Sequence, residues 1–91
     1  MPHTIRDRKP LLARVRRIKG QLAALEAELE AGGECSAVLQ QIAAVRGAVG
    51  GLMSQVMEGH IRDHLVSPEL SAEDRARDME QVLAALRSYL R

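Results

Sequence analysis

The sequence contains very little cysteine and almost no aromatic residues. Cys35 is its only thiol and Tyr89 its only aromatic side chain, and neither tryptophan nor phenylalanine occurs in its 91 residues. A single thiol excludes a disulfide within the chain, and a core without aromatic residues excludes a β-sandwich or barrel. Apolar residues still make up 46% of the chain. Any core must therefore use Leu, Val, Ile, Met and Ala, and this composition predicts an all-α fold.

Long apolar runs are also missing. Apolar residues recur at helical spacing, without the uninterrupted run of about 18 residues that a membrane span requires. No apolar segment of signal-peptide type lies near the N-terminus. We therefore expect a cytoplasmic protein with no membrane anchor, folded as a single domain over residues 1–91. A chain of this length buries only about 60 to 70% of its unfolded surface, so self-association is expected.

The formal net charge of +1 hides a strong asymmetry along the chain. The first twenty residues carry seven basic and one acidic side chain, whereas six basic and eleven acidic side chains follow. This segregation indicates a surface that binds a polyanion, although a solvated helix end would show the same charges.

Apolar residues repeat in alternating steps of four and three, which is the pattern of amphipathic helices. The first series predicts a helix over about 5–31, which Gly32 and Gly33 end. The second predicts a helix over about 35–66, which Pro68 ends. A third helix, over about 72–90, follows Ser71. The two long series comprise Leu11, Val15, Ile18, Leu22, Leu25 and Leu29, and then Val38, Ile42, Val45, Val49, Leu52 and Val56.

Several glycines lie inside the second predicted helix, where each costs up to about 1 kcal/mol relative to alanine. We expect them to let another backbone approach closely, as in tight helix pairing. They are Gly47, Gly50, Gly51 and Gly59.

Two histidines near the end of the second helix are spaced like ligands of one metal ion. His60 and His64 are four residues apart, which places both imidazoles on one helix face. Solvated histidines at a helix end show the same spacing, so further ligands are needed. Cys35 opens the same helix, but 25 helical residues separate it from His60, or about 38 Å. One chain therefore cannot close the site, and the alternative for Cys35 is a small buried apolar residue.

A second copy of the chain would close the site. If the second helix packs antiparallel against its copy, Cys35 of one chain lies beside His60 and His64 of the other, in two equivalent sites. The glycine turn returns the first helix antiparallel to the second, so its N-terminus brings His3 to the level of the two histidines. One thiolate and three imidazoles suit tetrahedral Zn²⁺, and an added amine or backbone ligand suits octahedral Co²⁺ or Ni²⁺.

Three stretches of the sequence are distinctive: LQQIAAVRGAVGGLM at 39–53, RVRRIKGQ at 14–21 and the closing SYL. With Cys35 and His60, they make the chain resemble the CsoR/RcnR/FrmR family, small all-helical bacterial transcriptional repressors that sense metals or formaldehyde. The resemblance covers essentially the whole chain. It implies a three-helix protomer, an antiparallel four-helix-bundle dimer and a flat homotetramer with a sensing site between subunits.

The resemblance leaves two effectors open. The nickel and cobalt sensors of this family use ligands that match His3, Cys35, His60 and His64. Its copper sensors carry a second cysteine in place of the last histidine, which argues against copper. Its formaldehyde sensors pair an N-terminal proline with the cysteine, and Pro2 is present here. Formaldehyde would then join the Pro2 amine to the Cys35 thiolate of a neighbouring subunit through one methylene group.

With this resemblance, the sequence favours a repressor that binds double-stranded operator DNA and releases it on binding Ni²⁺ or Co²⁺, with Zn²⁺ as a further metal. No winged or helix-turn-helix reading head is recognisable, so we expect recognition of phosphate charge and DNA shape. The candidate DNA contacts are Arg14, Arg16, Arg17, Lys19 and Arg46. A formaldehyde-sensing repressor without a cofactor is the alternative. A purely structural helical bundle, with incidental histidines, is the competing class. We do not expect an enzyme, because no acid–base pair, cofactor loop or cleft-forming architecture is recognisable.

Overall fold

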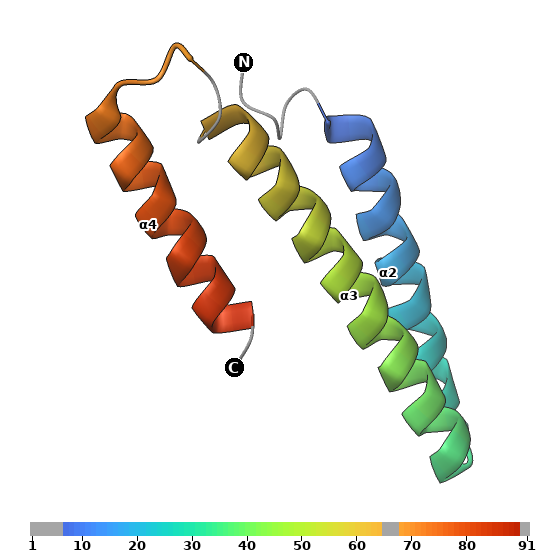
Figure 1. Cartoon of the computed structure of the whole chain (residues 1–91). Helices are drawn as coiled ribbons and strands as arrows, with labels where there is room; N and C mark the ends of the chain where they lie inside the picture. The colour runs from blue at the N-terminus through green and yellow to red at the C-terminus, as the bar shows by residue number, and fades with distance from the viewer. Residues whose placement is uncertain (1–6, 65–67, 90–91) are drawn as a thin grey trace. The chain divides into compact units, whose positions relative to one another are not determined.

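The computed structural model describes residues 7–64 and 68–89, and Figure 1 shows three α-helices within these ranges. They are α2 (Arg8–Glu30), α3 (Cys35–His64) and α4 (Ala72–Tyr89). The described residues form no strand, so the all-α, three-helix prediction is confirmed. The expected ends of the helices at 5–6, 65–66 and 90 fall outside the described residues. None of the described helices is long and apolar enough to cross a membrane.

The end of α2 is set by a left-handed glycine. Gly32 has a φ of 71°, a conformation in which a side chain would clash with the backbone. The N–H of Gly33 donates to the carbonyl of Glu28 over 2.9 Å, and that of Gly32 donates to Leu29 over 3.1 Å. This pair of bonds is a Schellman motif, which satisfies carbonyls left open at the helix end. The predicted glycine stop is therefore confirmed, and the next helix begins at Cys35.

Two compact units are distinguished along the chain, and the first is Lys9–Leu52. In it, α2 and the first part of α3 form an antiparallel hairpin, so that Arg14 near the start of α2 meets Gly51. Ile18, only 9% exposed, is the buried apolar residue of α2. Within one chain, the group that lies against Gly51 is the Arg14 guanidinium and not a backbone. A Cβ atom at Gly47 would meet nothing within 4 Å. The expected close backbone approach is therefore absent at these two glycines within this hairpin.

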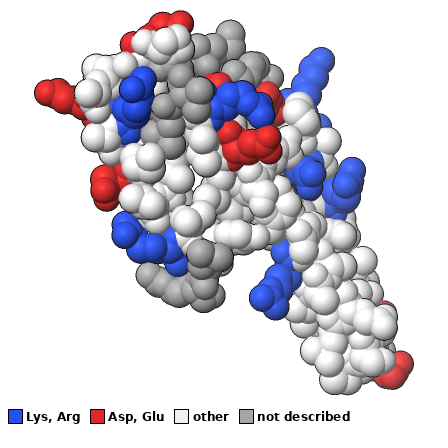
Figure 2. All heavy atoms as spheres, in the orientation of Figure 1, with Lys and Arg blue, Asp and Glu red and all other residues white. Residues whose placement is uncertain are grey.

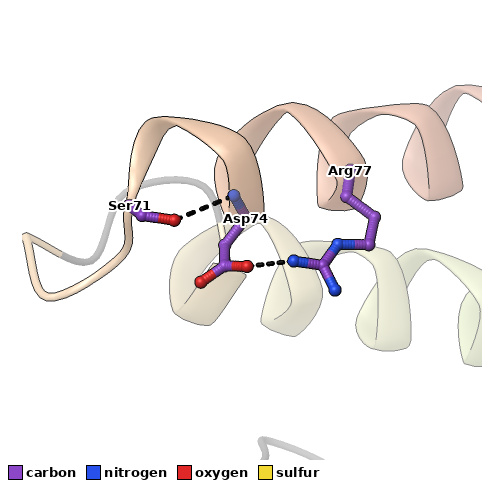
Figure 3. Close-up of polar contacts among 3 residues, drawn as sticks. All are labelled: Ser71, Asp74 and Arg77. Carbon is purple, nitrogen blue, oxygen red and sulfur yellow. Dashed lines mark hydrogen bonds and ion pairs between the residues drawn. The ribbon is translucent and has the colours of Figure 1, made fainter.

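The second unit contains the last part of α3, from Met53, and α4. Ser71 begins α4 as predicted: its Oγ accepts a hydrogen bond from the Asp74 N–H over 3.0 Å (Figure 3). Asp74 also pairs with Arg77 one turn further along. Serine at the cap and acid in the first turn both stabilise a helix N-terminus. Val82, 9% exposed, is the buried apolar residue of α4.

Of the twelve apolar residues in the two long series, five are exposed within one chain and only Ile18 is buried. Leu29 at the end of α2 is 58% exposed and Leu39 near the start of α3 is 59% exposed. Leu22, Ile42 and Val49 are exposed as well. Exposed apolar side chains at helical spacing are typical of surfaces that pack against other helices. The antiparallel dimer and the flat homotetramer remain predictions that this surface supports.

Candidate metal site and nucleic-acid interface

Cys35 is the first residue of α3 and its side chain is exposed. The alternative of a small buried residue is therefore wrong for the single chain. Glu34 precedes it as the N-cap: its carbonyl accepts the N–H of Val38 over 3.0 Å, and its carboxylate accepts the Ser36 hydroxyl over 2.8 Å. These contacts begin α3 at the cysteine and leave the thiol at the surface, where groups of another chain can reach it.

His60 lies in the other unit, on the face of α3 that packs against α4. Its Nε2 is 3.4 Å from the backbone carbonyl oxygen of Asp78. When Nε2 carries the ring proton it donates to this carbonyl, and the lone pair is then on Nδ1, the nitrogen that would bind a metal ion. A carbonyl partner of this kind orients many metal-binding histidines. The contact therefore suits His60 to the role of a ligand.

The ring of His60 also borders an apolar cavity of about 200 Å³ between α3 and α4. The imidazole is half-buried. Gln81 is the other polar residue in the lining, which comprises Met53, Val56, Met57, His60, Gln81, Val82 and Ala85.

The remaining predicted ligands are placed only in part. His64 is the last residue of α3, one turn after His60, so the helix brings these two positions onto one face. Pro2 and His3 lie outside the described residues. No three His, Cys, Asp or Glu side chains in the described ranges form a group that could hold a metal ion. Cys35 and His64 are the first and last residues of α3, and the sharing of the site between two chains stays a prediction.

The predicted DNA contacts all lie in the hairpin unit. Arg16, Arg17, Lys19 and Arg46 are exposed, whereas Arg14 is half-buried. Figure 2 shows basic side chains projecting along the hairpin and acidic ones at its lower tip, near the turn between α2 and α3. A phosphate backbone would be attracted to the basic part of the hairpin and repelled from the turn. Within the hairpin, the charge therefore changes from basic to acidic toward the turn between α2 and α3.

A family model of metal-sensitive transcriptional repressors matches residues 7–88. The chain belongs to this family. RcnR transcriptional repressors from Citrobacter koseri and Escherichia coli K12 are each 50% identical to it over 93 residues, covering the whole of both chains. An uncharacterised Serratia marcescens protein from the bioA 5′ region is 65% identical over 91 residues, again across both chains.

A solved structure extends this family relationship to the fold. It is a variant of the formaldehyde-responsive regulator FrmR from Salmonella enterica serovar Typhimurium, with 55% identity and a TM-score of 0.88. The match covers 97% of this chain and 99% of that one. This chain and FrmR therefore share the same all-helical fold.

Two contacts of this region were not predicted from the sequence. One is the Asp78 carbonyl beside His60, which lies on a different helix and has no side-chain signal. The other is the Gly51 backbone beneath the Arg14 guanidinium. Glycine inside a helix was a signal for close approach, but the spacing alone did not identify an arginine as the approaching group.

Proposed function

We propose that this chain is a repressor that holds operator DNA when metal-free and releases it when Ni²⁺ or Co²⁺ binds between subunits. The observation that carries the proposal is the placement of donors on α3. Cys35 is exposed at its first residue, and His60 stands in its last turns with Nε2 toward the Asp78 carbonyl. An antiparallel copy of α3 would bring these donors together. Membership of a metal-sensitive repressor family and identity to RcnR repressors support this function.

The proposed ligands are His3, Cys35, His60 and His64. One thiolate and several imidazoles form a donor set of intermediate softness, which suits Ni²⁺ and Co²⁺ and also accommodates Zn²⁺. The bound ion would supply bonds that join residues of two chains. In this chain, the Asp78 carbonyl orients His60, and α3 holds His64 one turn away on the same face.

Release of DNA requires that the metal bind the DNA-free conformation more tightly than the DNA-bound one, with a coupling of typically 1–3 kcal/mol. The N-terminal arm is the proposed lever. His3 precedes α2 by only a few residues, and the basic residues of α2 follow directly. Drawing His3 toward Cys35 of a neighbouring chain would tether the start of α2 and shift its basic face. A His3→Ala variant should therefore keep its DNA when metal is added.

Operator DNA is the partner that the repressor family implies. The proposed contacts are the exposed side chains of Arg16, Arg17, Lys19 and Arg46, together with Arg14. All belong to the unit in which α2 and α3 pair. A flat homotetramer in the cytoplasm would present several copies of this basic surface to one duplex.

An anaerobic Co²⁺ titration tests the metal site. Wild-type protein should develop thiolate-to-metal charge-transfer absorption. Cys35→Ala should lack this absorption and retain the weaker ligand-field bands of Co²⁺ bound by the imidazoles. DNA release is then followed by fluorescence anisotropy with a labelled duplex, selected from a random-sequence library for binding the metal-free protein. A wild-type protein that shows no charge-transfer band and keeps its DNA in Ni²⁺ and Co²⁺ would contradict the proposal.

Formaldehyde is the second candidate effector, and the exposed thiol of Cys35 together with the FrmR structure favours considering it. Removal of Met1 would leave Pro2 as a secondary amine. The amine nitrogen and the thiolate sulfur would each bond to the formaldehyde carbon, and its oxygen would leave as water, so that one methylene joins the two chains. No metal and no histidine is needed for this reaction.

His64 separates the two effectors. The solved FrmR structure is an E64H variant, and this chain has a histidine with the same number. His64→Ala should weaken release by Ni²⁺ and leave release by formaldehyde unchanged. Release of wild-type protein by formaldehyde alone would favour the second candidate.

A further inference from the structure

The guanidinium of Arg14 lies against the backbone of α3 at Gly51. A Cβ atom built on Gly51 would be 2.8 Å from Nη1 of Arg14 and 3.8 Å from its Cζ. The first distance is shorter than real Cβ contacts, so an alanine at this position would displace the guanidinium. Only glycine permits the observed approach of this side chain to α3.

Arg14 also differs in burial from its basic neighbours. Its side chain is half-buried, whereas Arg16, Arg17 and Lys19 on the same helix are exposed. Contact with α3 restricts the rotamers of a long side chain that would otherwise move freely in solvent. The guanidinium therefore lies against α3 on the basic part of the hairpin, with fewer rotamers open to it than a fully exposed arginine has.

We propose that Gly51 is a positioning residue for nucleic-acid binding, because its bare backbone holds the Arg14 guanidinium where a DNA phosphate binds it. The inference rests on the proposed DNA-binding function. A guanidinium offers paired N–H donors that match two phosphate oxygens, which makes its orientation important. A side chain that is ordered before binding loses less conformational entropy when the phosphate arrives.

Substituting Gly51 provides a direct test with a matched control. Gly51→Ala adds only a methyl group, and the atom that must move is the far end of a flexible side chain, so the helices can keep their packing. Gly47→Ala makes the same change one turn earlier on the same face of α3, where the new Cβ meets nothing within 4 Å. Both changes favour the helix equally. Any difference in DNA affinity between the two variants therefore results from the contact with Arg14.

Affinity for DNA is measured by fluorescence anisotropy on metal-free protein across a salt series. We expect Gly51→Ala to bind the labelled duplex roughly threefold to tenfold more weakly than wild type, which is the effect of freeing one ordered side chain. Because the freed guanidinium still reaches the phosphate, the slope of log K against log salt should stay close to that of wild type, whereas Arg14→Ala removes the contact and should lower the slope in magnitude by about one. Gly47→Ala should match wild type. Equal or higher affinity of Gly51→Ala would overturn the proposal.

A double-mutant cycle separates positioning of Arg14 from a change in helix packing. If Gly51 acts through Arg14, the Gly51→Ala change should have no further effect on DNA affinity in an Arg14→Ala background. The same loss in both backgrounds would show that Gly51 acts on the fold, and the proposal would be wrong. Proton exchange at the Arg14 guanidinium, measured by NMR, should accelerate in Gly51→Ala and not in Gly47→Ala.

The test is independent of the metal response. Failure of Ni²⁺ and Co²⁺ to release DNA from wild type would contradict the proposed sensor and leave the metal-free comparison intact. If the protein binds no selected duplex, elution from heparin in a salt gradient supplies the same comparison. Earlier elution of Gly51→Ala than of Gly47→Ala supports the role of Gly51, and co-elution overturns it.

Discussion

Mixing two complementary variants tests whether the proposed metal site is shared between chains. Cys35→Ala removes the thiolate and keeps the imidazoles, whereas a His60→Ala, His64→Ala double variant keeps the thiolate and removes the two imidazoles of α3. The continuous helix α3 separates Cys35 from His60 by 25 residues, or about 38 Å, whereas metal–ligand bonds are about 2.0–2.3 Å long. Neither variant alone can therefore combine sulfur and imidazole from α3 in one site.

The expected recovery follows from two-fold symmetry. When equal amounts of the two variants are refolded together, half of the dimers contain one chain of each kind. Each mixed dimer has one site with all of its α3 ligands and one site with none, and the unmixed dimers have no complete site. The mixture should therefore recover about one quarter of the wild-type sites.

Thiolate-to-Co²⁺ charge-transfer absorption under anaerobic conditions measures this recovery directly. The matched control is Cys35→Ala refolded with a variant that carries all three substitutions, which should recover nothing. Absorption in the test mixture no greater than in the separate variants would refute a shared site. Full wild-type absorption in either variant alone would refute the ligand assignment.

Three further changes test the helix caps and the basic surface. Ser71→Ala removes the oxygen that accepts the Asp74 N–H and should destabilise the protein by about 1 kcal/mol in urea unfolding. Gly32→Ala places a side chain at a φ of 71° and should cost about 1–2 kcal/mol by the same assay. Arg17→Ala removes an exposed basic side chain and should weaken DNA binding while lowering the salt slope by about one.

Each of these variants has a control on the same helix or of the same type. Ser88→Ala changes an exposed serine within α4 and should leave the unfolding free energy nearly unchanged. Gly20→Ala lies in α2, where the new Cβ meets nothing within 4 Å, and should stabilise by about 0.5–1 kcal/mol. Arg87→Ala changes an exposed residue of α4 and should not alter the salt dependence of DNA binding. Loss of stability in Gly20→Ala equal to that in Gly32→Ala would contradict the assigned role of the positive φ.

The helices and their caps were predictable from the sequence because they depend on interactions among residues a few positions apart. The Gly32 stop and the Ser71 cap are each completed by backbone groups within five residues. The same local geometry places His60 and His64 on one face of α3. The separation of Cys35 from these histidines also follows from the helical rise alone.

The contacts between helices were decided only by the tertiary structure, because packing brings together residues that are distant in the chain. His60 meets the carbonyl of Asp78 eighteen residues away, and a carbonyl is present at every residue, so no side chain marks this one. Arg14 meets Gly51 across the hairpin. The sequence by itself determined which groups carry charge, sulfur and imidazole, and helix packing determined which of these side chains are held in one orientation.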